Sequence, residues 1–298
     1  GKILVPLVTP FKANHEVDYE KAVQLAQYLI ENNRADTLVL AGTTGEFHTM
    51  TFDERVTLFK IMKSQFDGKI PMVAGVGAAS TIETIKLTQE AERLGFETVM
   101  VVAPYYTKPN QAELYDHYRA LSEAVSLNIM LYNIPIFTGV NLEPETVARL
   151  AEFDNIVALK EEAELNPKQM TAFMNVTPED FIIYNGDDTM ILEAYAQGGD
   201  KRIGGVISGA SHLIGDRIRT MIETFLAGKV EESAQMQREI FPLFRIMGQN
   251  GRTNPVCLLK EAIKICAIDA GLPRRPLSPG TPEEVDNVKT VLKQLNLI

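Results

Sequence analysis

The sequence predicts an α/β fold in which eight parallel strands close into a (β/α)8 barrel, the TIM-barrel fold, followed by a C-terminal three-helix appendage. Three observations predict it. Eight short apolar segments alternate with helical segments, 298 residues suffice for one large barrel, and no glycine-rich dinucleotide fingerprint follows the first strand. Two ordinary domains are the alternative that this length allows. We therefore expect residues 1–227 to form the barrel and residues 228–298 to extend the same domain.

Each predicted strand is a short apolar run bounded by turn-forming or charged residues, which is typical of strands buried on both faces. Asp18 is predicted to cap the first helix, and Thr51 with Glu54 and Ser80 with Glu83 to form capping boxes. The predicted strands are 3–9, 37–41, 71–75, 98–102, 128–132, 156–160, 181–184 and 202–208. The predicted helices of the barrel are 18–32, one that opens at residue 51, 80–95, one from about 111, 143–152 and 189–197. Those of the appendage are 230–247, 255–270 and 282–295.

Composition and charge exclude several classes of protein. A formal net charge of −10 argues against nucleic acid and anionic membranes as partners. No apolar run approaches the roughly 20 residues that cross a bilayer, and no secretory signal pattern opens the sequence. Cys257 and Cys266 lack metal-ligand spacing, and the histidines are scattered. We therefore expect a cytoplasmic, metal-free protein.

A single lysine, Lys160, ends the sixth predicted strand. Burial there favours the neutral amine, a nucleophile that forms imines with ketones and thereby makes the adjacent carbon acidic. The structural alternative is a lysine that reaches solvent or pairs with Glu161, which follows it together with Glu162.

Further polar groups follow other predicted strands, and in a parallel barrel all carboxyl ends of strands face one mouth. Tyr132 could move protons there. Thr43 and Thr44 stand between glycines and offer hydroxyls and backbone N–H groups to a carboxylate. The same mouth would receive Tyr106, Asn185, Gly186, Asp187, Asp188, Ile207 and Ser208. The set predicts a site for a 2-oxo acid.

Each of these groups also has a purely structural interpretation. Residues 42–45 are typical of a tight turn, and Tyr132 of an aromatic side chain that covers the core. Tyr106 follows another tyrosine in a segment that could be a surface loop or a subunit contact. Asp187 and Asp188 are typical of a helix N-cap. Their coincidence on strands that share one mouth favours the functional interpretation.

The motifs resemble those of the N-acetylneuraminate lyase and dihydrodipicolinate synthase family, the class I Schiff-base pyruvate lyases, along nearly the whole chain. The shared motifs are 7–11 (LVTPF), 42–46 (GTTGE), 103–106 (APYY), 131–135 (LYNIP), the Lys160 strand, 186–188 (GDD) and 205–208 (GVIS). In combination they are far more specific than the barrel alone.

The resemblance implies that Lys160 forms an imine with pyruvate and that Thr43 and Thr44 hold its carboxylate. It implies a proton relay of Tyr132, Thr43 and Tyr106, with Tyr106 supplied by a neighbouring subunit. It further implies a homotetramer built as a dimer of dimers, and neither cofactor nor metal. The remaining substrate-binding residues expected are Gly186, Ile207, Phe137 and Asp187.

The chain departs from the synthase pattern on the aldehyde side. In dihydrodipicolinate synthases the Tyr-Asn-(Ile/Val)-Pro motif precedes a small residue, arginine, threonine and glycine, whereas Phe137 stands at the arginine position here. That arginine would pair with the carboxylate of aspartate semialdehyde, a charged hydrogen bond that contributes about 1.5–3 kcal/mol. Phe52, Arg55 and Ala79 stand where inhibited synthases bind lysine, so we expect no lysine feedback.

We expect a pyruvate-dependent Schiff-base aldolase or lyase that acts on pyruvate and an aldehyde or on a 2-oxo acid. A 2-keto-3-deoxy sugar acid is the leading substrate class because of Phe137, and dihydrodipicolinate synthase activity is the alternative. A non-catalytic oxo-acid-binding protein is a lesser alternative, since every residue of the imine chemistry is present. The sequence assigns no role to Asp188, Glu161 or Glu162.

Overall fold

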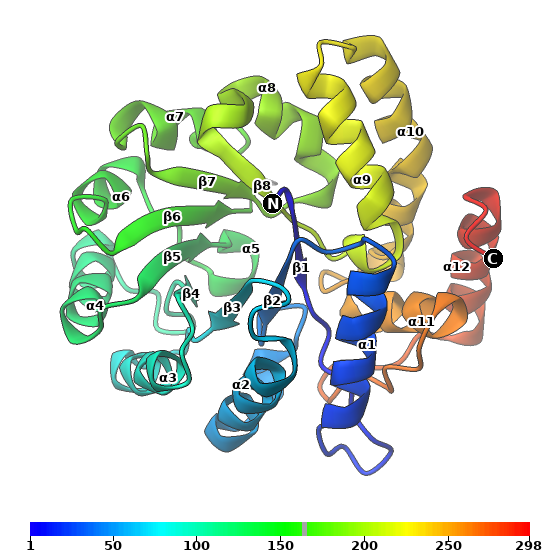
Figure 1. Ribbon diagram of the computed structural model, residues 1–298, viewed down its shortest axis with the longest axis horizontal. Helices are drawn as coiled ribbons and strands as arrows, with labels where there is room; N and C mark the ends of the chain where they lie inside the picture. Colours follow the sequence, from blue (N-terminus) through cyan, green and yellow to red (C-terminus); the bar gives the residue numbers. More distant parts are fainter. Residues whose placement is uncertain (163–165) are drawn as a thin grey trace. The chain divides into compact units, whose positions relative to one another are not determined.

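The computed structural model describes residues 1–162 and 166–298. Its eight strands follow one another in chain order around a closed barrel, with helices between them (Figure 1). This arrangement confirms the predicted fold class. The strands are β1 (Ile3–Pro6), β2 (Thr37–Leu40), β3 (Met72–Gly75), β4 (Thr98–Val102), β5 (Asn128–Asn133), β6 (Ile156–Glu161), β7 (Ile182–Asn185) and β8 (Ile203–Ile207).

One compact unit consists of Gly1 and Met72–Ile207, and we call it the 72–207 unit. Its strands β3 to β8 pair in parallel, each with the next. In this register Lys160 on β6 lies between Tyr132 on β5 and Tyr184 on β7. The helices of the unit are α3 (Thr81–Arg93), α4 (Gln111–Ala124), α5 (Pro135–Thr138), α6 (Pro144–Leu150), α7 (Gln169–Val176) and α8 (Ile191–Arg202).

The second compact unit joins the two ends of the chain, Lys2–Pro71 and Ser208–Ile298, and we call it the terminal unit. In it β1 pairs in parallel with β2, α9 packs on β1, and α10 packs on α9. The predicted boundary at residue 227 stays a prediction. The helices of the unit are α1 (Tyr19–Glu31), α2 (Phe52–Phe66), α9 (Ser211–Leu226), α10 (Val230–Ile246), α11 (Val256–Cys266) and α12 (Pro282–Gln294).

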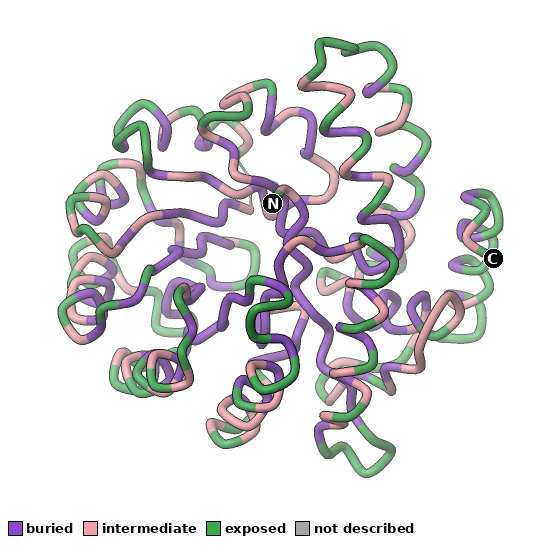
Figure 2. The backbone as a smooth tube through the Cα atoms, in the orientation of Figure 1, coloured by how far each residue is buried: buried purple, intermediate pink, exposed green. Residues whose placement is uncertain are grey.

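The burial pattern follows from the sequence. Figure 2 shows most of each strand buried, whereas buried and exposed positions alternate along the helices. Helix α1 buries the predicted apolar face of Ala22, Leu25, Ala26 and Leu29, spaced as on one side of a helix. None of the helices in the described part of the chain is long and apolar enough to cross a membrane.

Two local predictions are wrong. The first strand ends at Pro6, because the N–H of Val8 donates to Nε2 of His212 (3.2 Å) instead of joining a strand ladder. Ser80 makes no side-chain cap for α3. Thr84 instead ties the preceding segment to the helix: its hydroxyl accepts from the N–H of Ala78 (3.1 Å) and donates to the carbonyl of Ser80 (3.0 Å). The capping box of Thr51 with Glu54 and the N-cap of Asp18 form as predicted.

Candidate active site

Lys160 lies within β6, one residue before its end, and is only 5% exposed. Its Nζ atom lies 4.0 Å from the centroid of the Tyr132 ring, and Tyr132 is 2% exposed. The two side chains meet because paired residues on neighbouring parallel strands project to the same face of the sheet. The 72–207 unit therefore brings a buried amine and a buried phenol together, as the sequence analysis expects.

Gly186, just after β7, leaves the space that the lysine side chain occupies. A Cβ atom at this position would lie 2.7 Å from Cε of Lys160 and 2.9 Å from Oε2 of Glu162. The N–H of Gly186 donates to the carbonyl of Glu161 (2.8 Å), which holds the backbone in place. A side chain at residue 186 would thus collide with the carbon that bears the lysine amine and with the carboxyl group of Glu162.

Glu161 faces away from Lys160, because successive residues of a strand point to opposite faces. Its carboxylate accepts hydrogen bonds from Nδ2 of Asn133 (2.9 Å) and Nε2 of Gln169 (3.4 Å). Burial raises the pKa of Glu161 to about 8, although these two hydrogen bonds oppose the shift. Glu161 therefore belongs to a buried amide network and makes no pair with Lys160.

Glu162 lies on the same side as Lys160, two residues further along. Burial raises the pKa of Glu162 well above its usual value, and the lysine charge only partly opposes this. The nearby carboxyls of Asp187, Asp188 and Glu161 raise it further. The carboxyl group beside Lys160 is therefore biased toward its protonated form.

Asp187 combines a structural role with a free oxygen. Its Oδ1 accepts from both the N–H and the hydroxyl of Thr189 (2.7 Å each), so it caps the short helix that follows β7. Its Oδ2 is buried and has no hydrogen-bond partner among the described residues. The N-cap interpretation thus accounts for one of the two oxygens.

The other expected residues of the 72–207 unit differ in burial. Ile207 ends β8 and is buried. Phe137 lies in the short helix α5 and is 39% exposed. Tyr106 follows β4 with a φ of 75° and is 90% exposed. Within one chain, Tyr106 is therefore not part of the buried pair of Lys160 and Tyr132.

Thr43 and Thr44 lie in a tight turn of the terminal unit and are half-buried. The carbonyl of Thr43 accepts from the N–H of Glu46 (3.0 Å), and that of Gly45 accepts from the Thr9 hydroxyl (2.6 Å). Gly45 is closely packed, because a Cβ there would lie 3.0 Å from the carbonyl oxygen of Leu7. Backbone contacts thus fix the turn that presents the two threonines.

The same turn ends in a buried ion pair that sequence analysis missed. Nζ of Lys260 on α11 lies 2.6 Å from Oε1 of Glu46, and the two side chains are 1% and 0% exposed. The other carboxylate oxygen accepts from the N–H of Arg274 (2.8 Å). Burial lowers the pKa of Lys260, while the Glu46 charge opposes the shift. The signal in the sequence was a lysine among the apolar residues of 256–263.

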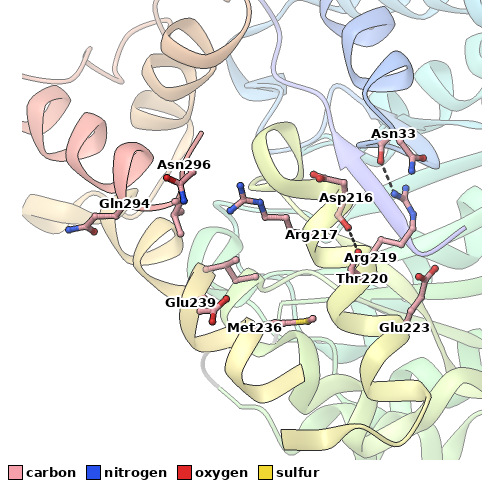
Figure 3. Close-up of a pocket in the computed structure, with 12 residues that line it drawn as sticks. Asn33, Asp216, Arg217, Arg219, Thr220, Glu223, Met236, Glu239, Gln294 and Asn296 are labelled. Carbon is pink, nitrogen blue, oxygen red and sulfur yellow. Dashed lines mark hydrogen bonds between the residues drawn. The ribbon is translucent and has the colours of Figure 1, made fainter. Parts of the chain in front are cut away.

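Figure 3 shows a surface pocket within the terminal unit, lined by side chains of α9 and α10, the end of α12 with the residues after it, and Asn33. Its charges are mixed, and Arg219 is already engaged with the carbonyl of Asn33 (2.7 Å) and with Asp36 (2.8 Å). None of Lys160, Tyr132, Glu162 and Gly186, which we call the Lys160 cluster, lines it. We assign no ligand to this pocket.

Comparison with known proteins decides the family. The model of the dihydrodipicolinate synthetase family matches residues 1–295. The chain belongs to this family. Members use a covalent imine between lysine and pyruvate, need no external cofactor and form a carbon–carbon bond. In the described ranges, 1–162 and 166–298, no group of three or more His, Cys, Asp or Glu side chains could hold a metal ion.

Several relatives match along their whole length. The 4-hydroxy-tetrahydrodipicolinate synthase of Desulforudis audaxviator is 42% identical, covering 100% of this chain and 98% of the relative. That of Moorella thermoacetica is 41% identical, covering 100% and 99%. Among solved structures, the lysine-bound enzyme of Cyanidioschyzon merolae matches with a TM-score of 0.93 at 38% identity, covering 100% and 99%.

These comparisons support the general prediction of a lysine-dependent pyruvate enzyme. They do not support the sugar-acid aldolase that we expected first, because the relatives carry the name of the synthase that was the alternative. That expectation was based on a single residue, Phe137, whereas the similarity to the synthase family extends over residues 1–295.

Proposed function

We propose that this protein is a 4-hydroxy-tetrahydrodipicolinate synthase, which condenses pyruvate with aspartate semialdehyde through an imine on Lys160. The observation that carries the proposal is the buried Lys160, whose Nζ lies 4.0 Å from the centre of the Tyr132 ring. Family membership over residues 1–295 supports the same chemistry. A non-catalytic protein would have no need to keep an amine buried beside a phenol.

In the proposed reaction the neutral amine of Lys160 attacks C2 of pyruvate, and loss of water gives the imine. Thr43 and Thr44 would hold the pyruvate carboxylate through hydroxyl and backbone N–H groups. Tyr132, with Thr43, would pass protons as the imine becomes an enamine. The enamine carbon then attacks the aldehyde and forms the new carbon–carbon bond.

Tyr106 would complete this relay from a neighbouring subunit. Its exposed side chain supports this role, since the phenol is available to another chain. We propose a homotetramer built as a dimer of dimers, although one similar structure is described as a monomeric synthase variant. The cytoplasmic location expected from the sequence stays a prediction.

One observation favours a second candidate, an aldolase for 2-keto-3-deoxy sugar acids. Phe137 stands where the synthase pattern has arginine, and it is part-exposed on α5. A phenyl ring cannot pair with the carboxylate of aspartate semialdehyde, whereas the aldehyde released from a sugar acid needs hydroxyl-binding groups. Substrate preference then separates the two candidates, because the pyruvate chemistry is common to both.

The test compares two reactions of the same purified protein. Condensation of pyruvate with aspartate semialdehyde is followed by coupling to a reductase, and cleavage of 2-keto-3-deoxygluconate by coupling pyruvate to lactate dehydrogenase. The proposal expects the larger kcat/KM for the condensation. A larger value for the cleavage would replace the synthase by the aldolase, and no turnover in either assay would contradict both.

A further inference from the structure

We propose that Glu162 is an additional catalytic acid–base residue, which donates the proton that expels water when the imine forms on Lys160. The inference rests on the proposed imine chemistry of Lys160 and deepens it. It assigns the proton transfer at the lysine nitrogen to a carboxyl group, in addition to the phenol of Tyr132.

The first argument is geometric. Lys160 and Glu162 are two residues apart, so they project to the same face, while Glu161 between them projects to the other. The N–H of Glu162 donates to the carbonyl of Asn133 (3.0 Å), which continues the pairing of β5 with β6 past the end of the strand. The alternation of side chains therefore holds through Glu162.

The side chains of Lys160 and Glu162 both approach Gly186. The point at which a Cβ of residue 186 would lie is 2.7 Å from Cε of Lys160 and 2.9 Å from Oε2 of Glu162. The carboxyl oxygen and the carbon that bears the amine thus flank one small space. A hydroxyl group formed on a carbon bonded to the lysine nitrogen would lie within reach of this oxygen.

The second argument concerns the charges that surround Glu162. Four charged groups act on Glu162: Lys160 and Glu161 precede it at the end of β6, and Asp187 and Asp188 lie in the segment after β7. Desolvation is the main cause that raises the pKa of Glu162, the Lys160 charge opposes it, and the three carboxyls raise the pKa further. A carboxyl group with a raised pKa keeps its proton to higher pH than an ordinary glutamate, and such a group is the acid that carbinolamine dehydration needs.

The proposed step balances without any other reactant. The lysine nitrogen bonds to C2 of pyruvate, and the proton it loses ends on the former carbonyl oxygen. Glu162 then donates its proton to this hydroxyl group, the carbon–oxygen bond breaks and water leaves. The products are a protonated imine and the carboxylate of Glu162, which have opposite charges. In hydrolysis the same carboxylate takes a proton from the attacking water.

The test measures imine formation apart from the overall reaction. Enzyme and pyruvate are mixed, quenched with borohydride at set times and analysed by mass for reduced adduct on the peptide that holds Lys160, across about pH 5 to 9. We expect the wild-type rate to fall at high pH as Glu162 loses its proton. Glu162→Gln should form the adduct about 10²-fold more slowly or worse, and should lack this high-pH fall.

Glu161→Gln is the matched control, because it makes the same chemical change on the opposite face of the same strand. It should keep the rate and still show a fall at high pH, which begins at a lower pH because one of the carboxyls that raise the pKa of Glu162 is gone. Glu162→Ala is the second variant and should share the loss, and thermal unfolding confirms that each variant is folded. A wild-type rate and pH profile in folded Glu162→Gln or Glu162→Ala overturns the inference. Absence of adduct in the wild-type protein contradicts instead the imine chemistry on which it rests.

Discussion

Replacing Lys260 by methionine should destabilise the protein strongly, although Lys260 is not part of the Lys160 cluster. Lys260 and Glu46 form an ion pair 2.6 Å apart, and both side chains are essentially inaccessible to water. Methionine has a similar volume and would pack against Phe11, whose ring centroid lies 4.3 Å from Nζ of Lys260. Among the described residues, it would leave the buried carboxylate of Glu46 with the N–H of Arg274 as its hydrogen-bond partner.

The size of the effect follows from this geometry. Breaking a buried ion pair by removing one partner costs about 3–5 kcal/mol, because the remaining charge is desolvated and uncompensated. Glu46→Gln combined with Lys260→Met removes both charges while the amide oxygen still accepts from Arg274. We therefore expect the double variant to recover most of the loss and to lie within about 1–2 kcal/mol of wild type.

The assay is urea unfolding of the wild-type, single-variant and double-variant proteins, with KM for pyruvate measured on each. Lys260→Met should also raise KM, because Glu46 ends the turn that carries Thr43 and Thr44. Arg252→Met is the matched control: it breaks the pair of Arg252 with Glu284 (2.8 Å) in the same unit but should leave KM unchanged. The reasoning is refuted if Lys260→Met is as stable as wild type, or if the double variant is no more stable than the single one.

Three further results are expected. Gly186→Ala should slow imine formation about 10²-fold in a folded protein, because its Cβ would displace Lys160 and Glu162; a wild-type rate would contradict this. Glu161→Gln should become more stable relative to wild type as pH rises from 4.5 to about 8, because the Glu161 carboxyl ionises at lower pH in the unfolded chain than in the folded one. The difference in unfolding free energy should reach on the order of 3 kcal/mol at pH 7, and a difference that does not change with pH would argue against it. Phe137→Arg should lower KM for aspartate semialdehyde about tenfold or more, and an unchanged KM would exclude a carboxylate contact at this position.

Much of the fold was predictable because its signals are local. The apolar face of α1 repeats at helical spacing and is capped by Asp18, and both features form as expected. Helices α7 and α9 were missed, and neither has a side-chain cap at its start. In α9, Gly215 lies where the helix meets the carbonyl of Arg34, so a residue that usually breaks a helix is required there by packing.

In the candidate site too, local signals were predictable from the sequence and long-range contacts were not. Lys160 was predictable because a lone lysine in an apolar strand is visible in the sequence itself. The position of Glu162 depends on how Gly186 approaches β6, which no local pattern reveals. Lys260 and Glu46 lie far apart in the sequence, so only the folded chain shows that they pair. Local patterns therefore point to the proposed reactive group, and tertiary contacts reveal the residues that surround it.

The central claim is that Lys160 becomes covalently joined to pyruvate, and one measurement tests it directly. The protein is incubated with pyruvate and borohydride, digested and analysed by mass, with a folded Lys160→Ala variant as the control. We expect one reduced pyruvate adduct on the peptide that holds Lys160, and none in the variant. An unmodified Lys160, or an equal adduct on another lysine in both proteins, would contradict the account.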